Sequence, residues 1–334
     1  MNLTTTYLGM RLPHPLIVGA GPLTDDLGTV RALEDAGAAA LVLRSLYEEE
    51  ITGEQMDAFF ASESHGESGA EAASYAPEPE LAFGPGEYLE HLRRVKDAVN
   101  IPVMASLNGS TPGGWISIAG LLEQAGADAV ELNLYHAASD AATSAAEVER
   151  QMIEIVRAVK AELRVPVAVK LSPLFTAFAH FASQLDAAGA DGLVLFNRFP
   201  RVDIDVVELE VVRALDLSDS SELHLRLRGI AALAGRVKAS LALTGGVHTA
   251  LDVVKATMTG AHVTQMVSAP LRHGPHHLRA IRVELKAWME ENEWESLDQM
   301  RGNMSFGRIP DPAAYERANY RMMFQRRALA ASQR

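Results

Sequence analysis

Short apolar runs recur along the chain, and longer segments with helical periodicity separate most of them. The run VPVAVKL at 165–171 is typical: its apolar side chains follow one another without alternation, as in a parallel strand covered on both faces. Strands are expected near residues 16–20, 39–44, 102–107, 128–133, 166–171, 191–196, 240–244 and 262–267. Helices expected between them include 25–35, 116–124, 145–162, 175–188, 227–237, 250–258 and 275–291.

A short phrase marks four junctions between a helix and the next strand. It reads DAGAAALVL at 35–43, QAGADAVEL at 124–132, AAGADGLVL at 187–195 and TGAHVTQM at 259–266. In each, a glycine suits the left-handed position that closes a helix, and an apolar strand follows within a few residues. Eight alternating strand and helix units predict an α/β fold, a single (β/α)8 TIM barrel. The alternative, an open doubly wound sheet, is disfavoured by the strand count and by the lack of an early GxGxxG loop.

Three segments do not fit a minimal barrel. Residues 46–87 form a long excursion after the second strand, rich in Ala, Glu, Ser and Gly, which is either a lid over the barrel mouth or a loop without a role. Residues 198–226 contain the alternating stretch VDIDVVELEVV, which predicts a hairpin beside the mouth. We expect a barrel domain at 1–291. The extension at 292–334 is expected to pack on the barrel or to join a subunit interface.

Composition narrows the class of protein. The chain has 334 residues, 48% of them hydrophobic, and a net charge of −13. The acidic balance argues against nucleic acid as a partner, and no apolar run reaches membrane-spanning length. The N-terminus does not look like a signal peptide, so a cytoplasmic enzyme is expected. The absence of cysteine excludes disulfides, thiolate metal sites and cysteine nucleophiles.

The candidate chemistry lies at the strand ends, because ligands of parallel barrels bind at the carboxyl ends of the strands. Lys170 ends the fifth strand, where a buried lysine is costly without an anionic partner; a lysine that reaches solvent is the alternative. Gly245-Gly246 after the seventh strand and Ser268 after the eighth suit a phosphate, although a tight turn is another interpretation of the glycines.

A phosphate on one side, a lysine opposite and amides between them describe a site for flavin mononucleotide, FMN. A cation near the ring would stabilise the anionic reduced flavin. The candidate cofactor-binding residues are Ala20, Gly21, Ser45, Asn108, Asn133, Lys170, Asn197, Thr244, Gly245, Gly246 and Ser268. No metal site is expected, because the histidine-rich run at 273–277 lacks carboxylates at ligand spacing.

These residues resemble those of the dihydroorotate dehydrogenases, in particular the soluble class of FMN-containing barrels. The motifs that carry the resemblance are ELNL at 131–134, VAVKLSP at 167–173, TGGV at 244–247, and QMVSA at 265–269 followed by Gly274-Pro275. They occur in the same order over roughly residues 5–290. The resemblance also implies a homodimer.

The resemblance assigns roles to individual residues. Lys170 would contact the flavin ring, and Ala20 and Gly21 would lie against the cofactor. Asn133 would bind near the ring and the substrate, with Asn108 and Asn197 as weaker assignments. Gly245, Gly246 and Ser268 would hold the phosphate.

The chain also departs from the family pattern. Arg44 stands where a lysine is usual, which keeps the charge but changes the geometry, and it could instead pair with a glutamate at 48–50. His136 stands at the position of the cysteine or serine base, where histidine can act as a base near neutral pH, or could be a plain loop residue. Ala138 replaces an asparagine that resembles a substrate clamp. The cofactor is therefore better supported than the substrate.

The sequence thus predicts an FMN-dependent oxidoreductase that acts on a small molecule, by resemblance dihydroorotate. In this mechanism His136 takes a proton from a substrate carbon, a hydride passes to flavin N5, and Lys170, with Arg44, stabilises the reduced flavin. Three alternatives stay open. They are a flavoprotein for a different dihydropyrimidine-like substrate, a non-catalytic FMN-binding protein, and a flavin-free lyase that forms a Schiff base on Lys170.

Overall fold

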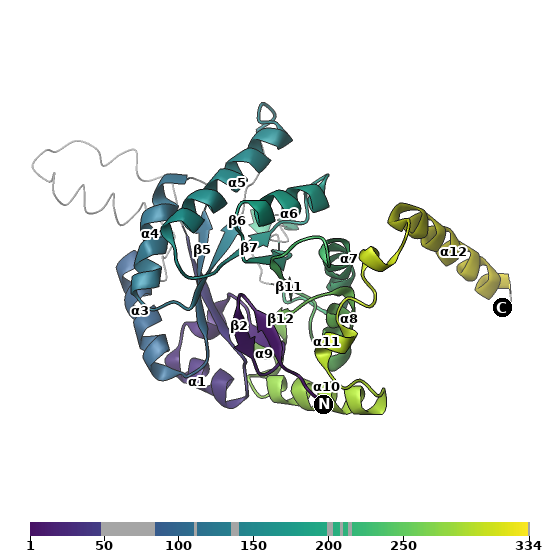
Figure 1. The fold of residues 1–334 in the computed structure, drawn as a ribbon, viewed down its shortest axis with the longest axis horizontal. Coiled ribbons are helices and arrows are strands. Elements are labelled where there is room, and N and C mark those ends of the chain that lie inside the picture. The colour runs from purple at the N-terminus through teal and green to yellow at the C-terminus, as the bar shows by residue number, and fades with distance from the viewer. Residues whose placement is uncertain are drawn as a thin grey trace, which may run out of the picture.

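Eight parallel strands close into a barrel, as the sequence predicts (Figure 1). The computed structural model describes residues 1–47, 84–109, 112–134, 140–198, 203–207, 210–212 and 216–332. The barrel strands are β3 (Leu16–Val18), β4 (Leu41–Tyr47), β5 (Val103–Gly109), β6 (Ala129–Leu134), β7 (Val167–Leu171), β8 (Gly192–Leu195), β11 (Ser240–Thr244) and β12 (Val263–Met266). They are hydrogen-bonded in this order, and β12 pairs with β3 to close the barrel.

Helices surround the barrel strands (Figure 1). The helices that follow successive strands are α1 (Leu27–Asp35), α3 (Pro85–Ala98), α4 (Pro112–Gln124), α5 (Ala145–Glu162), α6 (Phe178–Ala187), α7 (Leu223–Leu233), α8 (Ala250–Thr259) and α10 (His277–Glu291). A short helix, α9 (Ser268–His273), precedes α10. Helix α3 begins inside the excursion expected at 46–87, and the rest of that excursion from 48 to 83 lies outside the described residues.

The barrel interior is layered with a two-residue period. An antiparallel hairpin, β1 (Thr5–Tyr7) and β2 (Met10–Leu12), packs on one apolar layer of the interior. That layer consists of Ile17, Val42, Met104, Ala129, Ala168, Val194, Ala242 and Val263. Because successive strand side chains point to opposite faces, the residue two positions later in each strand faces inward again. The next layer is polar on several strands and includes Ser106, Glu131, Lys170 and Gln265.

The repeated junction phrase has a structural purpose beyond its glycine. Asp128 Oδ2 accepts the Val103 N–H at 2.7 Å, and Asp191 Oδ2 accepts the Val167 N–H at 2.8 Å. Each carboxylate also pairs at 2.6 Å with a lysine of the helix that leads into that neighbouring strand, Lys96 of α3 for Asp128 and Lys160 of α5 for Asp191. In the last repeat His262 takes the same position, and its Nδ1 accepts the Leu241 N–H at 2.9 Å. In three of the four copies, the side chain two residues after the glycine thus bonds to the start of the neighbouring strand; the first copy has Ala39 there.

His262 is therefore expected to make the stability of the fold depend on pH. Burial, with the nearby Arg301, lowers the pKa of His262 to about 4 from a usual 6.5. In the unfolded chain His262 binds a proton below about pH 6.5, whereas in the folded chain it does so only near pH 4. The free energy of unfolding therefore falls as the pH drops from about 6.5 to about 4. The loss is at most about 3 kcal/mol.

Urea unfolding at pH 7 and pH 4.5 measures this effect. His262→Asn keeps an acceptor for the Leu241 N–H but does not titrate, so the variant should lose less stability on acidification than the wild type. An equal loss in both proteins would contradict the assignment.

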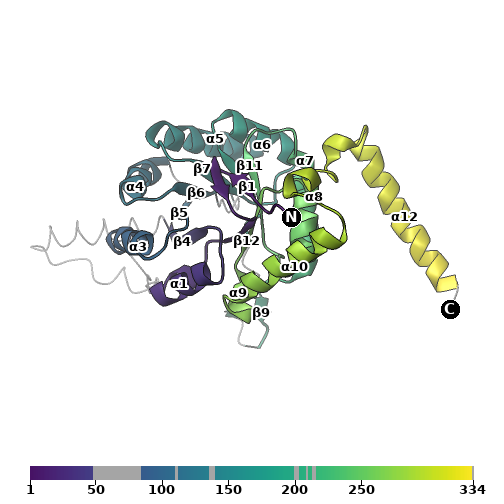
Figure 2. The ribbon, with the colours of Figure 1, turned by 60° about the horizontal axis from the view of Figure 1, so that its bottom comes forward.

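The segment at 198–226, which we call the insertion, and the C-terminal extension at 292–334 flank the barrel. Strands β9 (Asp203–Asp205) and β10 (Glu210–Val212) form the hairpin expected within 198–226. After α10, a short helix, α11 (Leu297–Met300), buries Leu297 and Met300 against the barrel domain. Helix α12 (Pro312–Ser332) extends away from the barrel (Figures 1 and 2). No helix in the described part of the chain is both long and apolar enough to cross a membrane.

Candidate active site

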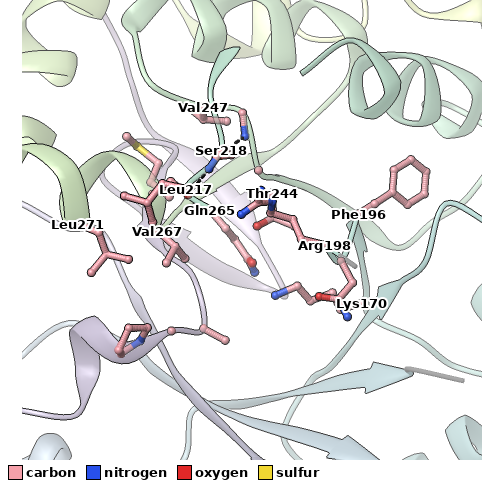
Figure 3. A pocket seen from close by; sticks show the side chains of 18 residues that line it. Lys170, Phe196, Arg198, Leu217, Ser218, Thr244, Val247, Gln265, Val267 and Leu271 are labelled. Carbon is pink, nitrogen blue, oxygen red and sulfur yellow. Dashed lines mark hydrogen bonds between the residues drawn. The ribbon is translucent and has the colours of Figure 1, made fainter. Parts of the chain in front are cut away.

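A cavity of about 250 Å3 lies at the carboxyl ends of the barrel strands (Figure 3). Eight of the residues expected to bind the cofactor line it: Ala20, Gly21, Lys170, Asn197, Thr244, Gly245, Gly246 and Ser268. Strands β3, β7, β8, β11 and β12 lead into these residues, so the fold brings together residues as far apart in the chain as Ala20 and Ser268. The insertion adds Leu217 and Ser218 to the lining, which the sequence did not indicate.

Lys170 is buried and has the anionic partner that its burial requires. Its Nζ lies 3.3 Å from Oε1 of Glu131, which is fully buried on the neighbouring strand β6. Gln265 donates from Nε2 to the other oxygen of Glu131 at 2.6 Å, and Figure 3 shows the Lys170 and Gln265 side chains ending close together. Glu131 therefore orients two side chains of the cavity. Burial, together with the charge of Glu131, raises the pKa of Tyr7 in the hairpin.

The turn after β11 needs both of its glycines. Gly245 and Gly246 have φ angles of 85° and 78°, a region that other residues rarely adopt. A Cβ at Gly246 would lie 2.7 Å from the backbone nitrogen of Leu223. Arg226 holds this turn from outside, because its Nε donates to the Thr244 carbonyl at 2.6 Å. The glycines are thus required by the conformation of the turn and by its close packing against Leu223 and Arg226.

Ser218 connects the insertion at 198–226 to this turn and to the start of α9. Its hydroxyl accepts the Gly246 N–H at 3.2 Å, and its own N–H donates to Ser268 Oγ at 3.0 Å. The hydroxyl also lies 3.2 Å from Nε2 of His248. Burial, with nearby Arg272, lowers the pKa of His248, which therefore stays neutral at pH 7. Small hydroxyl and amide groups thus gather at one end of the cavity, and Lys170 lies toward the other.

The remaining predicted residues lie outside the cavity lining. Arg44 pairs with Asp25 at 3.5 Å, rather than extending to the lining. Ser45 Oγ lies 2.7 Å from Ser106 Oγ in a buried pair. His136, the proposed base, falls outside the described residues, as does Ala138.

Two asparagines end neighbouring strands beside Lys170. Asn108 of β5 is in register with Asn133 of β6, which in turn is in register with Lys170. Within the described structure, the buried Asn133 Oδ1 and Gln265 Oε1 have no hydrogen-bond partner. Buried acceptors are rarely left unsatisfied, so both oxygens suit a ligand that donates hydrogen bonds.

Comparison with known proteins decides the family. A sequence model of dihydroorotate dehydrogenase matches residues 2–289, which is most of the chain. The chain belongs to the dihydroorotate dehydrogenase family. The enzyme is thus an oxidoreductase that acts on CH–CH groups, in agreement with the resemblance noted in its motifs.

Similar proteins span nearly the whole barrel. The chain is 29% identical over 308 residues to a putative dihydroorotate dehydrogenase A (fumarate) of Aeropyrum pernix, covering 90% of this chain and 97% of that protein. It is 25% identical over 305 residues to the catalytic subunit of dihydroorotate dehydrogenase B (NAD(+)) of Thermoplasma volcanium, covering 90% and 98%. The corresponding subunit of Methanosarcina mazei is 29% identical over 272 residues, covering 80% and 84%. These relatives carry names of two enzyme types.

Proposed function

We propose that this dehydrogenase binds FMN non-covalently in the cavity and oxidises dihydroorotate to orotate, a step of pyrimidine biosynthesis in the cytoplasm. The arrangement that carries the proposal is the cavity with Lys170 toward one end and the Gly245-Gly246 turn, Ser218 and Ser268 at the other. A cation and a phosphate cradle on one barrel mouth suit a flavin nucleotide.

Residues in the cavity lining and beside it fit FMN on two further observations. The unpartnered Asn133 Oδ1 and Gln265 Oε1 can accept hydrogen bonds from the N–H groups of a flavin ring or the hydroxyl groups of its ribityl chain. Glycines allow close packing at both sides of the cavity: a Cβ at Gly21 would lie 2.8 Å from Cγ1 of Val267, and one at Gly246 would meet Leu223 behind the turn. Gly245, Gly246, Ser218 and Ser268 would hold the phosphate, and Ala20 and Gly21 would lie against the cofactor.

In the proposed mechanism FMN, when bound, supplies the acceptor for the hydride that leaves the substrate. Lys170 stabilises the negative charge that develops in the cavity, and Glu131 keeps its ammonium group in place. His136, just after β6, takes the substrate proton as general base. Arg44 adds positive charge near the mouth from its position beside Asp25.

The positions at which this chain departs from the family pattern support one alternative class of substrate. Ala138 replaces an asparagine of the resembling family, so a different dihydropyrimidine-like compound is the second candidate. A Schiff-base lyase is less well supported, because a nucleophilic amine must be neutral and Glu131 pairs with Lys170 as an ammonium.

Anaerobic visible spectra of the purified protein test the proposal. We expect oxidised-flavin bands after purification or reconstitution with FMN, and bleaching of those bands on addition of dihydroorotate. Bands that persist with dihydroorotate but bleach with another dihydropyrimidine would favour the second substrate. A protein that takes up no FMN would refute the proposed function.

A further inference from the structure

Ser218 places a buried hydroxyl group in the cavity wall, and the fold fixes most of its hydrogen bonds. Its main-chain N–H donates to Ser268 Oγ at 3.0 Å, and its carbonyl accepts from Nη2 of Arg272 at 3.3 Å. Its Oγ accepts the Gly246 N–H at 3.2 Å. Figure 3 shows Ser218 at the end of the cavity away from Lys170. These contacts leave open only the direction of the hydroxyl hydrogen.

His248 is placed to decide where that hydrogen points. Its Nε2 lies 3.2 Å from Ser218 Oγ, and both side chains are buried. Ser218 lines the cavity, whereas His248 lies behind the lining. In a neutral imidazole Nε2 can accept a hydrogen bond, and the serine hydrogen is then directed at the ring. An imidazolium carries a hydrogen on both nitrogens and can only donate, so the serine hydrogen must point elsewhere.

The direction that remains is toward the cavity. A hydroxyl group donates one hydrogen bond and accepts up to two. When the Gly246 N–H and a cationic His248 both donate to Ser218 Oγ, its acceptor positions are filled and only the hydroxyl hydrogen is left to bond. Because Ser218 is a lining residue, this hydrogen is available to a ligand. A donor beside a cation favours an anionic acceptor, because charge-assisted hydrogen bonds are about twice as strong as neutral ones.

The surroundings of His248 allow its charge to change. Charged or titratable groups approach it from four elements: Arg272 and His273 of α9, Asp252 of α8, Asp219 of the insertion, and His277 of α10. Burial, with the guanidinium group, lowers the pKa of His248, and the two carboxylates oppose this effect. A further anion beside Ser218 would add to the effect of the carboxylates and favour the imidazolium.

We propose that His248 is a positioning residue for the phosphate end of the cofactor: when protonated, it turns the Ser218 hydroxyl toward the phosphate group of FMN and so strengthens binding below neutral pH. The inference rests on the proposed binding of FMN with its phosphate group beside Ser218. It implies that FMN binding takes up a proton on His248, because the cation and the phosphate stabilise each other. Riboflavin has the same ring and ribityl chain but no phosphate, so it gains nothing from this proton.

Flavin fluorescence titrations of the apoprotein at pH 8 and pH 6 test the inference. His248→Gln keeps a hydrogen-bonding side chain that does not titrate. We expect the ratio of wild-type to His248→Gln affinity for FMN to be about tenfold larger at pH 6 than at pH 8. The phosphate group itself titrates near about pH 6, but its protonation cancels in this ratio.

Two further variants separate this role from a general effect on folding. Ser218→Ala keeps the titrating ring but removes the hydroxyl, so its deficit in FMN affinity should also grow from pH 8 to pH 6. His180→Gln is the matched control, because His180 is exposed on α6 and lies outside the cavity lining. Its affinity relative to the wild type should be equal at both pH values. Riboflavin should show no such pH-dependent difference between the proteins, and circular dichroism checks that all are folded.

Titration calorimetry at pH 7 measures the proton directly. Binding heats in two buffers of different ionisation enthalpy give the protons taken up, and we expect more for FMN in the wild type than in His248→Gln. An affinity ratio that is the same at both pH values would overturn the inference and leave FMN binding intact. A wild type that takes up no FMN at either pH would instead refute the proposed function, and the inference with it.

Discussion

Replacing Lys170 with methionine is expected to slow the reduction of bound FMN by dihydroorotate by about 10²–10³-fold, the usual effect of removing one preorganised charge-stabilising group. Lys170 is the buried lysine of the cavity lining, and Glu131 fixes its Nζ from 3.3 Å away. Methionine keeps most of the side-chain volume, so the cavity should stay closed around the cofactor. Stopped-flow bleaching of the flavin under anaerobic conditions measures the rate.

Lys160→Met is the matched control for this experiment. Lys160 also pairs with a carboxylate, Asp191, but on the outside of the barrel and away from the cavity. The control should therefore reduce its flavin at close to the wild-type rate, even if it is less stable. If Lys170→Met reduces FMN as fast as the control, Lys170 has no role in the chemistry.

Glu131→Gln is expected to destabilise the fold by about 3–5 kcal/mol, because it leaves the buried ammonium of Lys170 without a compensating charge. The amide that replaces the carboxylate can still accept the hydrogen bond from Gln265, so the loss reports mainly on the ion pair. Urea unfolding of the apoprotein, with the midpoint and slope fitted together, measures the change.

A double-mutant cycle separates the pair from its surroundings. Lys170→Met alone leaves Glu131 uncompensated and should also be strongly destabilising, whereas Glu131→Gln/Lys170→Met removes both charges. The double variant should lose clearly less stability than the two single losses added together. Additive losses would mean that the two groups do not interact in solution. The double variant is also the charge-balanced protein in which to repeat the flavin reduction.

The order of elements could be predicted from the chain because each rests on local patterns. Apolar runs without alternation, glycines that close helices and the repeated junction phrase all act within a few residues of one another. These patterns are sufficient to predict the barrel and the hairpin within the insertion. Helix α3 was missed, because it begins within a segment whose composition suggested a continuous loop.

The candidate site was only partly predictable, because its remaining contacts join distant segments. Lys170, Gly245, Gly246 and Ser268 follow from the rule that ligands bind at strand ends. The same rule also predicts Arg44 as a site residue, but Arg44 pairs with Asp25 and does not line the cavity.

The residues at the barrel mouth can be predicted from the chain, because each short apolar run shows where a strand ends. What those residues contact follows only from the way the strands and the insertion meet in the folded protein. Glu131 reads as an ordinary motif residue, and Ser218 as one serine in a polar stretch, until strand register and the return of the insertion bring them to Lys170 and Gly246. The physical reason is that contacts between segments far apart in the chain depend on how the barrel closes, which no local pattern records.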